Sequence, residues 1–165
     1  MKCMIPLALT VVLLAGCEPG TTAIPGPVPP GVIIEIYAVA AVEGLGTKAA
    51  VDPTTKATIN LVGPPVVQTS DIATVAKSMI EIETVGGVEP AESVPALEIV
   101  LNPAGTKKML AATTSPNSST LAVLVDGQVV SVPQIFSPIN GSFRVTGDHR
   151  DPSFLNAISA VTGQP

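Results

Sequence analysis

The chain has 165 residues, of which 46% are hydrophobic and 13% are charged. This length allows one domain of ordinary size with a tail and excludes two large globular domains, and the hydrophobic share excludes wholesale disorder. The formal net charge is −5, no block of basic residues occurs, and the aromatic residues are one Tyr and three Phe, so the composition argues against a nucleic-acid partner.

The N-terminal residues have the organisation of a secretory signal. Lys2 supplies a positive start, and residues 5–14 form a mostly apolar stretch that is too short to span a bilayer. The sequence Leu14-Ala15-Gly16-Cys17 resembles the lipobox of bacterial lipoproteins, in which the peptide is cut before an acylated cysteine. We therefore expect a lipoprotein signal peptide at residues 1–16 and a lipid anchor, with palmitate, at Cys17. The alternative is an ordinary secreted protein with a chance cysteine.

The residue after the cysteine bears on which membrane the anchor enters. An Asp there favours inner-membrane retention in enteric bacteria, whereas this chain has Glu18. We expect the protein to lie in the cell envelope and face the periplasm, and we favour the inner leaflet of the outer membrane over the inner membrane. Because Cys3 leaves with the signal and Cys17 is acylated, the mature chain keeps no thiol for a disulfide or a metal site.

A segment rich in Pro and Gly follows the expected anchor. Residues 18–31 contain five Pro and three Gly, a composition that favours extended, polyproline-like geometry and cannot build a core. We expect residues 17–31 to form the lipidated cysteine and its tether, and residues 32–165 to form the folded domain.

The first half of this domain contains patterns of both strand and helix. Apolar and β-branched runs predict strands at residues 32–42 and 57–62. Ser70 is a candidate helix cap, and apolar residues at helical spacing then predict a helix over residues 70–79. The alternation of Ile and Glu at residues 80–83 predicts a strand with one face in water.

The second half carries stronger local signals. A strand is predicted at residues 96–101, followed by a helix that Asn102 caps and that ends near Thr114. Strands at residues 121–125 and 128–132 flank Asp126-Gly127, a strong type I′ hairpin signal, and Asn140-Gly141 precedes a strand at residues 142–146, so we expect a three-stranded meander. Asp151-Pro152 begins a last helix, which Gly163 ends.

These elements predict an α+β fold. We expect a mainly antiparallel sheet of about seven strands, with about three helices packed on one face. The order of the strands in the sheet cannot be read from the sequence.

Several fixed points in the C-terminal half are similar to one family. They are the runs Val123–Gly127 and Val129–Ile135, the turn Ile139-Asn140-Gly141, and Val145-Thr146-Gly147. They resemble the head subdomain of the first periplasmic domain of SecD, an accessory subunit of the bacterial protein translocase. The resemblance covers residues 32–162 and is most specific over residues 121–147.

The resemblance implies a SecD periplasmic-head-like fold and contact with polypeptide. In that family the head stands on a base subdomain above membrane helices and contacts polypeptide that leaves the channel. We expect no proton-driven pulling from this chain alone, since it shows no resemblance to the base or the helices. Fold analogy does not by itself settle function.

The single histidine, His149, is a candidate for a hydrolytic catalytic triad. Asp148 and His149, with Ser142 or Ser153 nearby, could form a nucleophile, base and orienting carboxylate. However, no Gly-x-Ser-x-Gly elbow occurs, and adjacent side chains in an extended segment diverge. A turn or surface role is the alternative that we favour.

Acidic residues raise the question of a calcium site. Glu81, Glu83, Glu89 and Glu92 are close in sequence, but they lack the compact spacing and the glycine of a calcium loop. We interpret them as a solvated edge that discourages strand addition. No metal and no small-molecule cofactor is expected.

The segment after the predicted hairpin is the candidate contact for polypeptide. Ile135, Phe136 and Ile139 could form an apolar patch there, although these residues could also belong to the core. We predict a non-enzymatic, membrane-anchored periplasmic lipoprotein that binds protein or polypeptide and is linked to protein export. Its expected partners are the membrane, through Cys17, and an envelope protein or an exported polypeptide. The alternatives are a structural envelope lipoprotein in a fixed assembly, or a hydrolase that uses Asp148 and His149.

Overall fold

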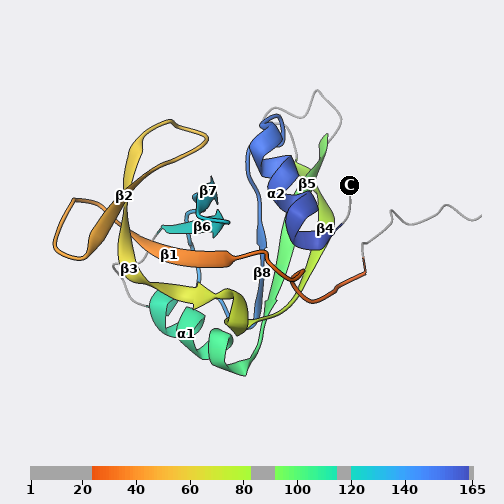
Figure 1. Ribbon diagram of the computed structural model, residues 1–165, viewed down its shortest axis with the longest axis horizontal. Helices are drawn as coiled ribbons and strands as arrows, with labels where there is room; N and C mark the ends of the chain where they lie inside the picture. Colours follow the sequence, from red (N-terminus) through yellow and green to blue (C-terminus); the bar gives the residue numbers. More distant parts are fainter. Residues whose placement is uncertain (1–23, 83–91, 115–119, 164–165) are drawn as a thin grey trace, which may run out of the picture.

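The computed structural model describes residues 24–82, 92–114 and 120–163, and within them eight strands form two antiparallel sheets (Figure 1). The five-stranded sheet has the order β2 (Thr47–Val51), β3 (Thr58–Gln68), β1 (Ile34–Ala40), β6 (Leu121–Val125) and β7 (Gln128–Ser131). The three-stranded sheet has the order β4 (Ile72–Ile82), β5 (Glu92–Leu101) and β8 (Ser142–Val145).

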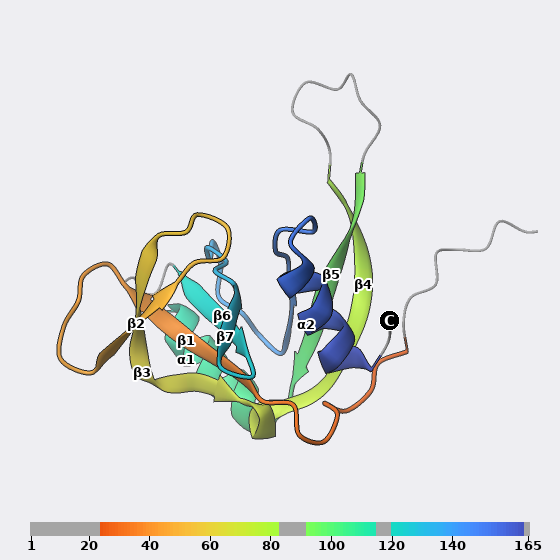
Figure 2. The ribbon, with the colours of Figure 1, turned by 45° about the horizontal axis from the view of Figure 1, so that its top comes forward.

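Two α-helices fill the space beside and between the sheets. Helix α1 (Pro103–Thr114) contacts β3 and β5, so it spans the base of both sheets. Helix α2 (Pro152–Thr162) contacts β4, β5 and β7, and it lies between the two sheets (Figure 2). A 3-10 turn at Thr69–Asp71 joins β3 to β4.

One apolar core is shared by both sheets and both helices. Strand β6 shows how it is built, because all five of its residues are buried. Leu121, Val123 and Val125 face the main core, whereas Ala122 and Leu124 face a second cluster on the opposite face of the five-stranded sheet. A strand between two neighbours that is covered on both faces reads as a continuous apolar run, as LAVLV does.

Several local signals in the sequence are confirmed. Asn102 caps α1, since its Oδ1 accepts a hydrogen bond from the Gly105 amide at 2.9 Å. The hairpin turn has positive φ at both central residues, 49° at Asp126 and 79° at Gly127. Helix α2 begins after Asp151 as expected and ends at a left-handed Gly163.

The helix predicted over residues 70–79 is wrong, because residues 70–71 lie in the 3-10 turn and residues 72–79 belong to β4, which continues through Ile82 of the strand predicted at residues 80–83. Strand β4 pairs with β5 in antiparallel register from Ile72–Leu101 to Ile82–Glu92. The apolar spacing at the start of the segment fits a helix and a strand alike, and pairing with a partner about twenty residues away decides between them.

The single sheet and the meander are also corrected. The fold is α+β and mostly antiparallel, as expected, but β8 pairs with β5 rather than with β7. The three strands predicted as a meander therefore belong to two sheets. Strand β2 was not predicted, and the described residues hold eight strands and two α-helices instead of about seven and three. Helices do not cover one face of one sheet, because α2 lies between two sheets.

Asp71 fixes the corner where the chain leaves the five-stranded sheet. Its side chain is buried, and both of its carboxylate oxygens lie 2.8 Å from Lys108 Nζ on α1. The Gln68 amide donates to Oδ2 at 3.0 Å, and the Asn102 amide donates to the backbone carbonyl at 3.0 Å. A Cβ at Gly105 would lie 2.4 Å from that carbonyl oxygen, so α1 can approach the corner only with glycine there.

These contacts favour the charged form of Asp71. Burial raises the pKa of Asp71, but the hydrogen bonds from Lys108 and the Gln68 amide, with the positive charge of Lys108, hold the pKa below its ordinary value of 3.8. A carboxyl group whose pKa is lowered by folding contributes stability above the unfolded pKa. That contribution is lost as the pH falls through the folded value.

We expect Asp71→Asn to lower the free energy of unfolding by about 1.5–3 kcal/mol at neutral pH, because an amide cannot replace the charged hydrogen bonds to Lys108. The difference from wild type should shrink as the pH falls below 3.8. Urea unfolding at a series of pH values measures both effects, with the exposed Glu43→Gln as the matched charge control. An equal loss in the control, or a difference independent of pH, contradicts this role of Asp71.

Candidate functional site

The chain crosses from one sheet to the other through residues 132–141, which we name the crossing segment. It joins β7 to β8 and is fixed at both ends by backbone hydrogen bonds. At its start, the Leu121 amide donates to the Pro133 carbonyl at 3.0 Å; at its end, the Leu101 amide donates to the Gly141 carbonyl at 2.7 Å. The segment is thus held by β6 on one side and by the end of β5 on the other.

The three residues expected to contact polypeptide all lie on the crossing segment, in different environments. Ile135 and Ile139 are half-buried and pack against the main core, and the Ile139 amide donates to Thr113 Oγ1 of α1 at 2.9 Å. Phe136 is 88% exposed. Two of the three side chains therefore help to hold the segment down, and the aromatic ring between them is presented to solvent.

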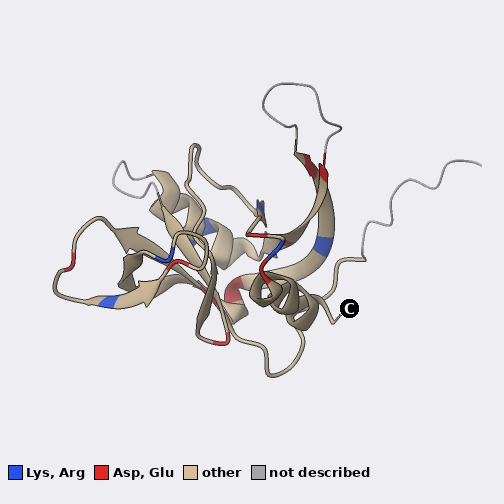
Figure 3. Ribbon diagram, turned by 90° about the horizontal axis from the view of Figure 1, so that it is seen from above, with Lys and Arg blue, Asp and Glu red and all other residues tan. Residues whose placement is uncertain are grey.

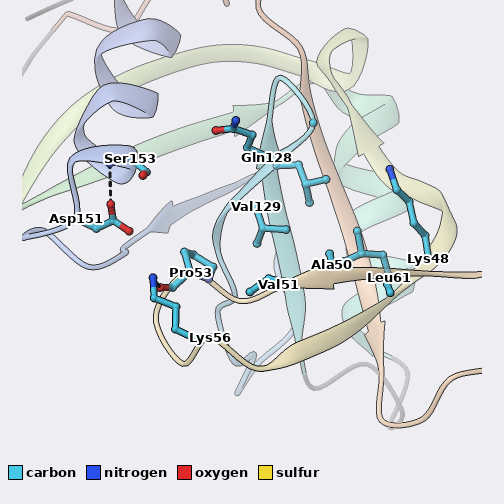
Figure 4. Close-up of a pocket in the computed structure, with 13 residues that line it drawn as sticks. Lys48, Ala50, Val51, Pro53, Lys56, Leu61, Gln128, Val129, Asp151 and Ser153 are labelled. Atoms are coloured by element: carbon cyan, nitrogen blue, oxygen red, sulfur yellow. Dashed lines mark hydrogen bonds between the residues drawn. The ribbon is translucent and has the colours of Figure 1, made fainter.

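A cavity of about 410 Å³ opens on the face of the five-stranded sheet that carries the second cluster (Figure 4). Leu61, Leu124 and Val129 line it with apolar surface, and Lys48 and Lys56 are among its polar lining. Figure 4 places the two lysines at opposite ends of the view, with the β2 residues between them. Polar and apolar groups contribute about equally to its lining.

Asp151 also lines this cavity. The Ser153 amide donates to Asp151 Oδ1 at 2.8 Å, and this bond, with a smaller effect from the positive charge of Lys56, holds the pKa of Asp151 below its ordinary value. The N-cap of α2 thus places a carboxylate beside Lys56. Sequence reasoning missed the cavity because one wall is β2, whose sequence TKAAV lies in a loop-like region without a strand pattern.

The candidate hydrolytic residues are not assembled into a triad. His149 Nε2 lies 3.2 Å from Glu92 Oε1 at the start of β5, within ion-pair distance but without hydrogen-bond geometry. Asp148 Oδ1 accepts from the Arg150 amide at 2.9 Å, so it stabilises the turn before α2. In the part of the chain that the structure describes, no hydrogen bond joins His149 to Asp148 or to a serine.

Two of the acidic residues considered for calcium, Glu81 and Glu92, lie at the end of the β4–β5 pairing that adjoins residues 83–91, where Figure 3 shows acidic positions together. Glu81 and Glu92 are both exposed there, whereas Glu83 and Glu89 lie outside the described residues. Across residues 24–82, 92–114 and 120–163, no group of His, Cys, Asp and Glu is arranged to hold a metal ion.

The expected anchor lies outside the described residues, as do Cys17 and residues 1–16. None of the described helices is long and apolar enough to cross a membrane.

The architecture is an α+β head domain in which two antiparallel sheets share one core. The chain belongs to the family of the SecDF P1 head subdomain, whose model matches residues 57–153. The resemblance of the domain to the SecD head, expected from the sequence, is confirmed by this match.

Two solved SecDF structures are similar to the chain. One, described as a membrane component SecDF that enhances protein export, has a TM-score of 0.47 and 18% identity over 79% of this chain and 61% of that chain. The other, SecDF in a super-membrane-facing form, has a TM-score of 0.48 and 18% identity over 79% of this chain and 18% of that chain. The chain thus spans less than two thirds of either structure. No curated protein matches it in sequence.

The different environments on the crossing segment predict different effects on stability. Phe136→Ser should leave the free energy of unfolding within about 0.5 kcal/mol of wild type, because an exposed ring gives up little on truncation. Ile139→Ser should lower it by about 1–2 kcal/mol, since the side chain packs against the main core. Urea unfolding monitored by circular dichroism compares them. A large loss for Phe136→Ser would show that the ring is part of the core.

Proposed function

We propose that this protein is a membrane-anchored, non-enzymatic module that binds polypeptide in the periplasm and acts in protein export. Its membership of the SecDF P1 head family supports a role related to export, because that head is a non-catalytic part of a translocase accessory protein. The single observation that carries polypeptide binding is the exposed ring of Phe136 on the crossing segment.

The argument for Phe136 rests on how it is presented. A lone exposed apolar side chain on a free loop needs no functional explanation. The crossing segment, however, is hydrogen-bonded at both ends, and its other two large apolar residues turn toward the core. The ring is therefore held outward by a fixed backbone, and little conformational entropy remains to be lost on binding. Aromatic anchors of this kind contribute most to contacts between proteins.

The proposed lipid anchor at Cys17 would determine where the module lies in the cell envelope. A diacylated or triacylated Cys17 would hold the protein on a membrane, since each buried methylene contributes about 0.8 kcal/mol and two or more chains act together. The proposed partners are this membrane and an exported polypeptide or envelope protein. We favour the inner leaflet of the outer membrane because Glu18, rather than Asp, follows the cysteine.

We expect metabolic labelling with a palmitate analogue to mark the wild-type protein, and Cys17→Ser to abolish both the label and recovery in the membrane fraction. The chain offers a matched control, because its other cysteine, Cys3, lies within the expected signal peptide. Cys3→Ser should therefore label as wild type does. Retained label in Cys17→Ser would show that the anchor is elsewhere.

We expect Phe136→Ser to weaken binding of an unfolded polypeptide at least fivefold, because the ring would lose its apolar contact. The probe is a fluorescently labelled protein kept unfolded by reduction and carboxymethylation, titrated with full-length protein in detergent and followed by anisotropy. Leu45→Ser is the control, since Leu45 is a fully exposed apolar residue in the loop between β1 and β2.

The outcomes separate the proposal from its alternatives. Equal binding by wild type and Phe136→Ser would remove Phe136 as the contact. Failure of the wild type to bind the probe, together with one stoichiometric envelope partner after cross-linking in cells, would favour a structural lipoprotein in a fixed assembly.

A further inference from the structure

Strand β4 is an edge strand of the three-stranded sheet, with β5 on one side only. Its eleven residues run from Ile72 to Ile82. In an antiparallel sheet the backbone N–H and C=O groups of alternate residues point to opposite sides of the strand. Half of the β4 residues therefore direct their hydrogen-bonding groups away from β5.

One of these outward residues already has an added partner. The Gly26 amide donates to the Val75 carbonyl at 3.0 Å, and the Val75 amide donates back to the Gly26 carbonyl at 2.7 Å, in an antiparallel bridge. Two residues on, Val28 packs against the main core. Figure 2 shows this N-terminal segment, in orange-red, running beside β4. Gly26, which belongs to the segment expected to be a tether, thus pairs with the edge strand of the sheet.

The sequence of residues 24–29 is compatible with an edge strand. Prolines at positions 25, 27 and 29 alternate with Ile24, Gly26 and Val28. Because Gly26 faces β4, its proline neighbours face the other way, where their missing N–H groups remove no bond to the sheet. The same prolines leave no donors on the outer side, so no further strand is added there.

Farther along the edge, Met79 and Glu81 have the same orientation as Val75. Met79 stands opposite Pro95 of β5, which has no N–H to donate, and this fits a pair that is not hydrogen-bonded across β4 and β5. Within the described residues, no strand pairs with the outer side of Met79 or Glu81. Met79 is also 52% exposed. The edge can therefore accept more chain than it holds at Val75.

We propose that the outer edge of β4 binds an extended, proline-free stretch of client polypeptide as an added antiparallel strand, in competition with residues 24–28. This inference rests on the proposed polypeptide-binding function and adds a second site to it. Glu81 and Glu92 are exposed where the β4–β5 pairing adjoins residues 83–91; their charge discourages addition of acidic or neutral strands there and favours a client stretch with a basic residue beside them. An added strand gains main-chain hydrogen bonds that are independent of the client sequence.

The competition follows from the size of the two contacts. Residues 24–28 make one bridge of two hydrogen bonds to β4, whereas a longer added strand would bond at Met79 and Glu81 as well. Because residues 24–28 belong to the same chain, they return when the client leaves. The apparent affinity for the client then depends on the fraction of molecules whose edge is open.

The test uses three variants of the full-length protein in detergent and the unfolded probe described above. Met79→Pro removes an outward N–H without removing a bond to β5, so it should weaken binding at least fivefold while the fold persists. Met79→Ala keeps the amide and should bind within twofold of wild type. Gly26→Pro removes the donor to Val75 and should strengthen binding about threefold by opening the edge.

Hydrogen exchange gives a second measurement that needs no variant. In the wild type, the probe should slow exchange of the Met79 and Glu81 amides at least fivefold, because an added strand accepts their hydrogen bonds. Gly26→Pro should show the same protection at lower probe concentration. Thermal unfolding checks the fold of each variant.

The results distinguish this inference from the function on which it rests. Equal binding by Met79→Pro and Met79→Ala, without protection of the two amides, overturns strand addition; if Phe136→Ser still weakens binding, the proposed function stands. A wild type that binds no probe overturns both. Protection of the two amides in the wild type, with binding lost in Met79→Pro but kept in Met79→Ala and Gly26→Pro, establishes the edge as a site.

Discussion

The buried Asp71 carboxylate holds together the parts of the fold that meet at the first corner. The chain leaves the five-stranded sheet at β3 and enters the three-stranded sheet at β4, and Asp71 stands between them. Its side chain is only 6% exposed, so it needs a partner inside the protein, and α1 supplies Lys108. The same helix must come close enough to bond, which Gly105 allows. The relative placement of the two sheets thus depends on one carboxylate and on the helix that satisfies it.

Helix α1 also holds the crossing segment, which is the second connection between the two sheets. Lys108 binds Asp71, where the chain passes from β3 to β4. Near the C-terminal end of α1, Thr113 Oγ1 accepts a hydrogen bond from the Ile139 amide on the crossing segment. One helix therefore positions both connections, and the presentation of Phe136 follows from it. A surface contact held by helix and sheet is more precise than one on a free loop. This is why the exposed ring can be part of the function while its neighbours Ile135 and Ile139 serve the core.

The sequence predicts what is local and fails where pairing is distant. The Asn102 cap, the Asp126-Gly127 turn and the ends of α2 are each determined by a few adjacent residues, and the structure has them as expected. Residues 72–79 of β4 read as a helix, because the pairing with β5 that makes them a strand lies outside any local pattern. For the same reason one sheet was expected instead of two. Phe136 could be named from its sequence neighbourhood, but its exposure could not. The cavity and the edge of β4 depend on strands that the pattern missed or misassigned.

The pairing of Gly26 with β4 would link the proposed anchor to the head domain. If Cys17 carries the lipid, as proposed, the chain between Cys17 and the bridge at Gly26 can span at most roughly 30 Å. If the bridge is released, the limit is set by the chain from Cys17 to Val32 and rises to roughly 50 Å. A client that takes the β4 edge would therefore also lengthen the reach of the head from the membrane. Because both proposed effects depend on one bridge of two hydrogen bonds, binding at the edge and distance from the membrane would be coupled by the covalent chain itself.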